Sequence, residues 1–369
     1  MRDLTNAEDW FVSVVSGRRK GAGAAIARGV FSAAEPIYAA AIHARNFLYT
    51  RRILKAAHAR RPVVSVGNLT TGGTGKTPMV AWLVGQLHQA GRMPAVLLRG
   101  YRSSNGVSDE ELLLRELIAP APVRAQADRL AASERILTDH PQIDVFVLDD
   151  GLQHRQLARY FSIVLVDATS PFGFEHVLPR GLLREPMRGL RRANAVVITR
   201  ADLVDSMTLD AIEQRIHGQH QNVPIFRCDL RQDGLLDPAG HTQSIDALKG
   251  QRLFAFCGIG NPEAFFRQIE IGGGKIVGTR RFADHHPYTA DELTDLLAKA
   301  RAAGADIALT TEKDWVKIGP MVKQMPEHPP ILRVGVSVVI QNDEGPRLVK
   351  LAMEGIRQGD ELLKWRQKG

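Results

Sequence analysis

Cysteine, aromatic residues and long apolar runs are all scarce in this 369-residue sequence. Its two cysteines, Cys228 and Cys257, are too few for a disulfide framework or a multi-cysteine metal site, which favours a reducing compartment. Charged residues interrupt the apolar N-terminal region before it reaches the roughly 18 residues that a membrane-spanning helix requires. Because the few aromatic residues do not alternate with basic ones, we expect no nucleic-acid partner.

The charge balance is basic, with a formal net charge of +8, which favours acidic partners such as phosphorylated substrates and anionic membranes. Within the N-terminal segment, residues 1–61, we expect a helix that opens at Pro36 and runs through Leu48. Every charged residue from Arg45 to Arg61 is basic. The segment either lies on an anionic membrane, where each Lys or Arg gains roughly 1 kcal/mol, or packs on the protein with a solvated basic face.

From residue 62 onward, short apolar runs alternate with helical stretches. The runs lie at residues 63–66, 95–98, 145–148, 163–166 and 195–198, and the first helix is expected at 78–90. This alternation is typical of an α/β fold with a mostly parallel sheet covered by helices on both faces. We expect a P-loop NTPase-like domain at residues 62–228.

A second, smaller α/β domain is expected at residues 229–340, after a Gly-, Asp- and Pro-rich stretch. Its strands are predicted at 253–256, 275–277, 307–310 and 331–336, and its helices at 262–269 and 289–303. Residues 341–369 then form a C-terminal helical segment.

A glycine-rich stretch between the first strand and the first helix predicts a phosphate-binding loop. Glycines let backbone N–H groups approach phosphate oxygens, and the following helix adds its positive end. Lys76 would reach the β- and γ-phosphates of ATP, and the Thr77 hydroxyl would ligate Mg²⁺. The expected nucleotide-binding residues are Thr70, Thr71, Gly72, Gly73, Thr74, Gly75, Lys76 and Thr77. Thr70 stands where a P-loop usually has its first glycine, so this loop is a variant; the alternative is an incidental glycine-rich turn.

Two carboxylates, Asp149 and Asp150, directly follow the apolar run at residues 145–148. The carboxyl end of a parallel strand is where ligands of doubly wound sheets bind, and a P-loop needs an acid on the magnesium side. Both are therefore candidate metal ligands, and which of them contacts the metal stays open. Thr199-Arg200-Ala201-Asp202 has a distant similarity to the base-reading motif of GTP-binding proteins, but Arg replaces the expected Lys, and we interpret the segment as structural.

A series of further segments resembles one family closely, the tetraacyldisaccharide 4'-kinases, which phosphorylate lipid A precursors. The segments occur in the family's order across residues 62–317. They are Gly67-Asn68-Leu69-Thr70, Arg99-Gly100-Tyr101, Asp149-Asp150-Gly151-Leu152-Gln153-His154, Leu178-Pro179-Arg180-Gly181-Leu182-Leu183-Arg184-Glu185-Pro186, Phe256-Cys257-Gly258-Ile259-Gly260-Asn261-Pro262, Phe282-Ala283-Asp284-His285-His286 and Thr310-Thr311-Glu312-Lys313-Asp314.

The resemblance implies transfer of the ATP γ-phosphate to the 4'-hydroxyl of a tetraacylated glucosamine disaccharide 1-phosphate, giving lipid IVA. It also implies two α/β domains and peripheral contact with the cytoplasmic face of the inner membrane of a Gram-negative bacterium; the cofactors expected from the P-loop, ATP and Mg²⁺, agree with this reaction. The alternative function is a nucleotide-hydrolysing P-loop switch or metallochaperone, which would leave the segments around residues 178–186 and 284–286 without a role.

The family's catalytic Asp–His pair carries over to Asp109 and His285, with Lys76 as the third catalytic residue. Glu110 remains an alternative to Asp109, because residues 108–111 match the family's segment only in part. A histidine oriented by a carboxylate can accept the proton of a sugar hydroxyl. The alternative for His285 and His286 is a turn that caps the helix starting near residue 289.

Four further residues are candidates for contacting the substrate's phosphate or sugar: Arg99, Gln153, His154 and Arg184. Arginine suits this task because its planar guanidinium binds phosphate through two parallel hydrogen bonds. Glu312-Lys313-Asp314 either lines the site or forms a structural loop.

Overall fold

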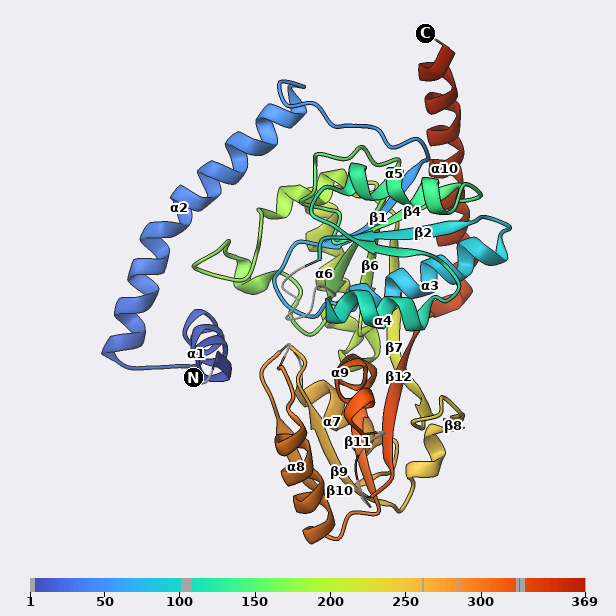
Figure 1. Ribbon diagram of the computed structural model, residues 1–369. Helices are drawn as coiled ribbons and strands as arrows, with labels where there is room; N and C mark the ends of the chain where they lie inside the picture. The colour runs from blue at the N-terminus through green and yellow to red at the C-terminus, as the bar shows by residue number, and fades with distance from the viewer. Residues whose placement is uncertain are drawn as a thin grey trace. The chain divides into compact units, whose positions relative to one another are not determined.

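The computed structural model describes residues 4–100, 108–260, 262–284, 286–322, 325 and 329–368 (Figure 1). These residues form two compact units. The larger unit contains Glu8–Leu230 and the chain from Val338 on, and the smaller one contains Arg231–Ser337 with the start of α1 (Leu4–Val15). The chain passes between the units within β7 (Ile225–Leu236) and again within β12 (Ile331–Ile340), and the expected boundary at residue 229 lies within β7. The predicted α/β class is confirmed.

Parallel strands in the order β6-β5-β1-β4-β2-β3 form the sheet of the larger unit, and the start of β7 pairs with β6. Their bounds are β1 (Val63–Asn68), β2 (Pro94–Leu98), β3 (Val123–Ala125), β4 (Val145–Asp149), β5 (Phe161–Asp167) and β6 (Ala195–Thr199). Every residue of β1, β2, β4, β5 and β6 is buried, which explains their continuous apolar sequences. All five runs predicted from the sequence are strands; β3 and β7 were not predicted.

Helices cover both faces of this sheet. The core on one face joins the strands to α3 (Lys76–Gln89), α4 (Asp109–Leu117) and α10 (Gly345–Lys368). On the other face α5 (Arg129–Asp139) and α6 (Ser206–Gln219) pack on opposite ends of the strand order. Three of these helices begin at side-chain caps: Ser108, Asp128 and Asp205 each accept a hydrogen bond from the backbone three residues on. The short 3₁₀ helices here are η1 (Gly173–Glu175), η2 (Met187–Arg192), η3 (Ala201–Leu203) and η5 (Gln341–Asp343).

The helix expected in the N-terminal segment is longer than the sequence predicted. α2 (Ala22–Thr50) runs unbroken through Pro36, so the expectation that Pro36 opens a helix is wrong. Proline lacks one backbone donor, but the alanine-rich residues on both sides favour helix strongly enough to continue past it. Among the described residues, no helix combines the length and the hydropathy that crossing a membrane would need.

The smaller unit has its own parallel strands in the order β10-β9-β11-β12. They are β9 (Arg252–Cys257), β10 (Lys275–Arg281), β11 (Ile307–Thr311) and β12; β8 (Thr242–Ser244) pairs antiparallel with the end of β7. Two apolar cores lie in this unit, one formed with α8 (Ala290–Ala302) and α9 (Glu312–Val322), the other with α7 (Pro262–Ile271). A short 3₁₀ helix, η4 (Ile245–Leu248), precedes β9. The four strands and two helices predicted for this part of the chain are present.

Candidate active site

The predicted phosphate loop connects β1 to α3. Gly72 and Gly75 have φ values of 106° and 82°, a conformation that favours glycine, and Gly75 is the N-cap of α3. Thr70, at the variant position, is buried and forms an antiparallel bridge with Leu183. Thr71 continues this contact, because its backbone N–H donates to the Leu182 carbonyl over 2.7 Å. A neighbouring segment therefore holds the start of the loop in an extended conformation.

Asn68, the last residue of β1, joins several of the predicted residues. Its Oδ1 accepts a 3.3 Å hydrogen bond from Lys76 Nζ and a short one from Arg184 Nη2. Its Nδ2 donates to the Thr70 carbonyl over 3.0 Å, and its own carbonyl accepts from Gln153 Nε2 over 2.9 Å. Asn68 is fully buried. The sequence placed Asn68 in a matching segment but gave it no role, because nothing local shows which distant side chains meet it.

Asp149 is the last residue of β4 and Asp150 follows it; β4 lies beside β1, with Val66 opposite Asp149. Asp150 has a left-handed backbone (φ 52°), and its carboxylate accepts two hydrogen bonds from Arg184, of 2.7 Å and 2.8 Å. Asp149 is 3% exposed, and its Oδ1 has no hydrogen-bond partner within the described part of the chain. The two adjacent carboxylates thus occupy different environments, one paired and one open.

Their ionisation differs accordingly. Burial raises the pKa of Asp149 to about 7, with a further increase from the negative charge of Glu110 and a partial decrease from Lys76. Burial also acts to raise the pKa of Asp150, but the hydrogen bond and charge of Arg184 outweigh it and hold that pKa below its usual value. At neutral pH, Asp150 is ionised and Asp149 is partly protonated.

Gln153 and His154 follow the two acids. Gln153 Nε2 donates to Asn68 O and, over 2.9 Å, to the buried Glu185, whose other oxygen lies 2.5 Å from Arg192. Burial lowers the pKa of His154 to about 4, aided by four positive charges around it. Those charges belong to Arg129, Arg159, Arg45 and Arg99. The surroundings of His154 are therefore strongly positive, which suits an anionic ligand.

The predicted catalytic pair is described only in part. Asp109 is the first residue of α4, and Glu110 beside it is close enough to Asp149 to raise its pKa. Arg99 is exposed directly after β2. His285 lies outside the described residues, as do Tyr101 and Asn261 of the matching segments. The roles of these residues stay predictions.

Two predicted segments of the smaller unit have structural contacts. His286 stacks on Phe282 with ring centroids 4.6 Å apart, and its Nε2 lies 3.2 Å from Glu292 Oε2. The cap of α8 is made by Thr289, which forms a reciprocal capping box with Glu292. Asp314 is fully buried, and its carboxylate accepts from Gly258 N, Tyr288 Oη and Thr311 Oγ1. Asp314 is thus an anchor of the smaller unit's core.

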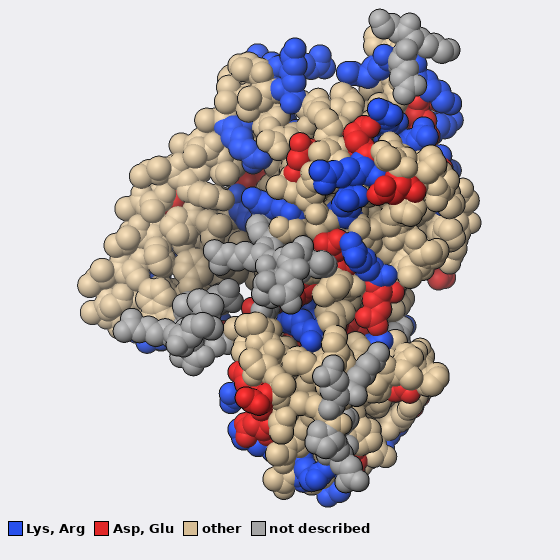
Figure 2. All heavy atoms as spheres, viewed as in Figure 1, with Lys and Arg blue, Asp and Glu red and all other residues tan. Residues whose placement is uncertain are grey.

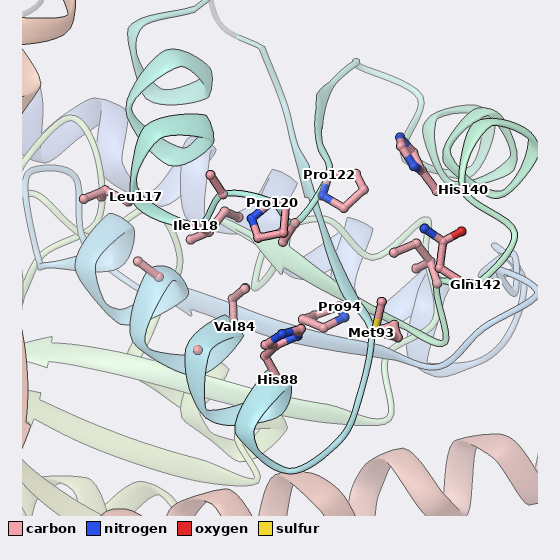
Figure 3. A pocket seen from close by; sticks show the side chains of 15 residues that line it. Val84, His88, Met93, Pro94, Leu117, Ile118, Pro120, Pro122, His140 and Gln142 are labelled. Carbon is pink, nitrogen blue, oxygen red and sulfur yellow. The ribbon is translucent and has the colours of Figure 1, made fainter.

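A cavity of about 280 Å³ lies at the other end of the larger unit's sheet (Figure 3). Pro94, Pro122 and Ile143, which line it, lie at or shortly before the amino ends of β2, β3 and β4. The P-loop and the two acids lie at the carboxyl ends of the strands. Because parallel strands place these ends on opposite edges, the cavity is separate from the candidate active site.

Comparisons with known proteins converge on one family. A model of the family "Tetraacyldisaccharide-1-P 4'-kinase" matches residues 29–352. A tetraacyldisaccharide 4'-kinase of Geobacter metallireducens is 38% identical over 307 residues, which span 78% of this chain and 88% of that protein. That of Halothermothrix orenii is 34% identical over 317 residues, spanning 78% of this chain and 82% of its own. The crystal structure of LpxK from Aquifex aeolicus, in complex with ATP, is similar with a TM-score of 0.70 and 27% identity, covering 89% of this chain and 99% of that one.

Proposed function

The chain belongs to the tetraacyldisaccharide-1-P 4'-kinase family, and from this premise we propose how its residues carry out the reaction. It is a kinase of lipid A biosynthesis that transfers the γ-phosphate of ATP to the 4'-hydroxyl of tetraacyldisaccharide 1-phosphate. The main support for this site is the parallel pairing of β1 with β4, because the P-loop follows β1 and the two acids stand at the end of β4. This is the arrangement that phosphoryl transfer from a nucleotide requires.

ATP is bound through its phosphates by residues 70–77. The backbone of the loop and the start of α3 supply N–H donors, and Lys76 supplies positive charge at the β- and γ-phosphates. Lys76 is already directed toward the site by its hydrogen bond to Asn68. The Thr74 hydroxyl is buried in the loop without a hydrogen-bond partner among the described residues, which leaves it available to a phosphate oxygen.

The donor set fits Mg²⁺, a hard cation that prefers carboxylate and hydroxyl oxygens. Asp149 is the better candidate for a direct ligand, because its buried Oδ1 has no hydrogen-bond partner within the described ranges. Asp150 is engaged by Arg184, and Thr77 stands in the first turn of α3. When bound with ATP, Mg²⁺ would supply charge neutralisation at the phosphates.

The acceptor hydroxyl is activated by His285, oriented by Asp109 or by the alternative Glu110. The histidine takes the hydroxyl proton as the oxygen attacks the γ-phosphorus, and the bond to the β-phosphate oxygen breaks to release ADP. Such general-base assistance contributes about 10²–10⁴-fold, so most of the acceleration comes from positioning and charge.

The substrate is anionic, and the site around His154 is positive. Arg99 and His154 are the candidates for direct contact with the disaccharide or its 1-phosphate, since four arginine charges surround His154. Gln153 and Arg184 act on the substrate indirectly, because their side chains are hydrogen-bonded to Asn68, Glu185 and Asp150. They hold the neighbouring residues of the site in place.

The helix α2 attaches the protein to the membrane surface from which the lipid comes. Its polar residues face the protein: Glu35 pairs with His176, Tyr38 donates to the Arg184 carbonyl, and Arg45 donates to the Gln153 carbonyl. Its apolar residues Ile26, Val30 and Ile37 are 60–74% exposed. Figure 2 shows α2 as a mostly uncharged surface with Lys and Arg near the end that leads to β1. An exposed apolar face with a basic flank favours peripheral binding to an anionic leaflet.

One assay tests the function. The protein is incubated with ATP, Mg²⁺ and tetraacyldisaccharide 1-phosphate in detergent, and the lipid is analysed by mass spectrometry. We expect a product heavier by one phosphoryl group, and its absence when Lys76 is replaced by Ala. ATP hydrolysis that is insensitive to the lipid, without a phosphorylated product, would instead indicate a nucleotide-hydrolysing switch.

A further inference from the structure

Two residues at the end of β6 donate side-chain hydrogen bonds to backbone carbonyls of the P-loop. Thr199 Oγ1 donates to the Thr74 carbonyl over 3.1 Å, and Arg200 Nη2 donates to the Gly73 carbonyl over 2.9 Å. Thr199 is fully buried. These two carbonyls belong to consecutive peptide units in the part of the loop that leads into α3.

The Arg200 side chain is held in place by a third residue. Asp167, at the end of β5, pairs in register with Thr199 and accepts a short hydrogen bond from Arg200 Nη1. The side chains of this pair are only 13% and 10% exposed, so solvent screens their attraction little. The Asp167 carboxylate also accepts from the backbone and the hydroxyl of Thr169, over 3.0 Å and 2.7 Å. A rigid strand end thus carries the arginine that contacts the loop.

Through the geometry of the peptide bond, these contacts to carbonyl groups also orient backbone N–H groups of the loop. In a planar trans peptide the C=O and the next residue's N–H point in opposite directions. When Thr199 fixes the Thr74 carbonyl, it therefore fixes the Gly75 N–H on the other side of the peptide plane. The Gly73 carbonyl fixed by Arg200 likewise orients the Thr74 N–H, which donates over 3.1 Å to the Gly72 carbonyl and closes a tight turn.

We propose that Thr199, Arg200 and Asp167 form a brace that pre-orients residues 73–75 of the P-loop for the phosphates of the nucleotide. They are positioning residues, and their role rests on the proposed binding of ATP by this loop. The brace also gives a function to the Thr199–Asp202 segment that differs from base reading. Arg200 stands where GTP-binding proteins place a base-contacting lysine, but its guanidinium is engaged by Gly73 and Asp167.

The test compares phosphate recognition with base recognition. Thr199→Val removes the hydroxyl that donates to the Thr74 carbonyl but keeps the shape of the side chain, and Thr199→Ser keeps a hydroxyl. Arg200→Met removes the hydrogen bond to the Gly73 carbonyl. The matched control is Thr138→Val, since the Thr138 hydroxyl also donates to a backbone carbonyl, on the exposed surface of α5. We measure the Kd for ATP and for adenosine, KM and kcat, and the ratio of kcat/KM for ATP to that for GTP.

For Thr199→Val and Arg200→Met we expect about a fivefold or larger increase in the ATP Kd, as expected for the loss of one hydrogen bond. The adenosine Kd and the ATP/GTP ratio stay unchanged, and Thr199→Ser and Thr138→Val behave like wild type. Unchanged ATP affinity in folded Thr199→Val and Arg200→Met would overturn the brace, as would a changed ATP/GTP ratio in Arg200→Met. If wild type itself fails to bind ATP, the proposed function fails, which the wild-type titration shows separately.

Discussion

Arg184 and Asp150 are joined by two parallel hydrogen bonds, of 2.7 Å from Nη1 to Oδ2 and 2.8 Å from Nη2 to Oδ1. The same guanidinium reaches Asn68, which also accepts from Lys76. One arginine therefore links the acid at the end of β4 to the P-loop lysine. Asp149, the neighbouring acid, makes no hydrogen bond to Arg184, and its pKa is raised where that of Asp150 is lowered.

Arg184→Lys should lower kcat about 10-fold or more although the positive charge is kept. A lysine cannot form the two parallel bonds that hold Asp150 while also reaching Asn68. Steady-state kinetics with ATP and the lipid acceptor measure the effect, with the exposed Arg188→Lys as control. Equal activity of both variants would show that the paired geometry is dispensable.

Asp149→Asn should abolish activity and yet stabilise the folded protein in metal-free buffer at pH 8. The folded-state pKa of Asp149, about 7, lies above the ordinary aspartate value of about 3.9, so protonation of Asp149 favours the folded state. The contribution of protonated Asp149 to the free energy of unfolding is fully present below about pH 4 and is lost as the pH rises through about 7. The total loss of stability is up to about 4 kcal/mol.

The neutral amide lacks this pH dependence. Thermal unfolding in EDTA should therefore show the difference in Tm between Asp149→Asn and wild type growing from pH 5 to about pH 7 and then levelling off. The control is Asp139→Asn, whose side chain is 58% exposed. A difference in Tm that does not change with pH would contradict the burial of an ionisable Asp149.

Asp109→Asn and Glu110→Gln should have different kinetic effects. If Asp109 orients His285, its replacement lowers kcat about 10²–10⁴-fold with ATP affinity nearly unchanged.

Glu110→Gln should instead move the acidic limb of the pH profile of kcat/KM to lower pH, because the Glu110 charge raises the pKa of Asp149. Higher Mg²⁺ should move the same limb in the same direction, since the metal competes with the proton. The reverse pattern would make Glu110 the partner of His285.

Val30→Glu and Ile37→Glu should reduce binding to anionic liposomes while leaving kinase activity in detergent nearly unchanged. These side chains are 60% and 74% exposed on α2, so a carboxylate there disrupts apolar and electrostatic attraction to lipid but no internal contact. Met207→Glu, at a 79% exposed position on α6, is the matched control. Liposome flotation measures binding, and equal flotation of all variants would sink the membrane role of α2.

Much of the fold could be read from the sequence, because buried parallel strands have continuous apolar runs. The strand β3 was not predicted because it has only three residues, of which Val123 alone is buried. The start of α2 was misplaced because a proline usually opens or ends a helix, whereas here the helix continues through Pro36. The placement of the P-loop and the two acids at one edge of the sheet could also be predicted, because ligands bind at the carboxyl ends of parallel strands.

What the sequence by itself determined is the set of chemical groups: a variant phosphate loop at residues 70–77, two acids after a buried strand, and a series of segments typical of one kinase family. The tertiary structure alone decided how these groups differ. Asp149 and Asp150 are adjacent in sequence, yet one is buried near Glu110 and the other is paired with Arg184. Thr199, Arg200 and Asp167 likewise became a support of the P-loop only through the order of β1, β5 and β6 in the sheet. Ionisation and loop geometry depend on groups close in space, and folding brings those groups from distant parts of the chain.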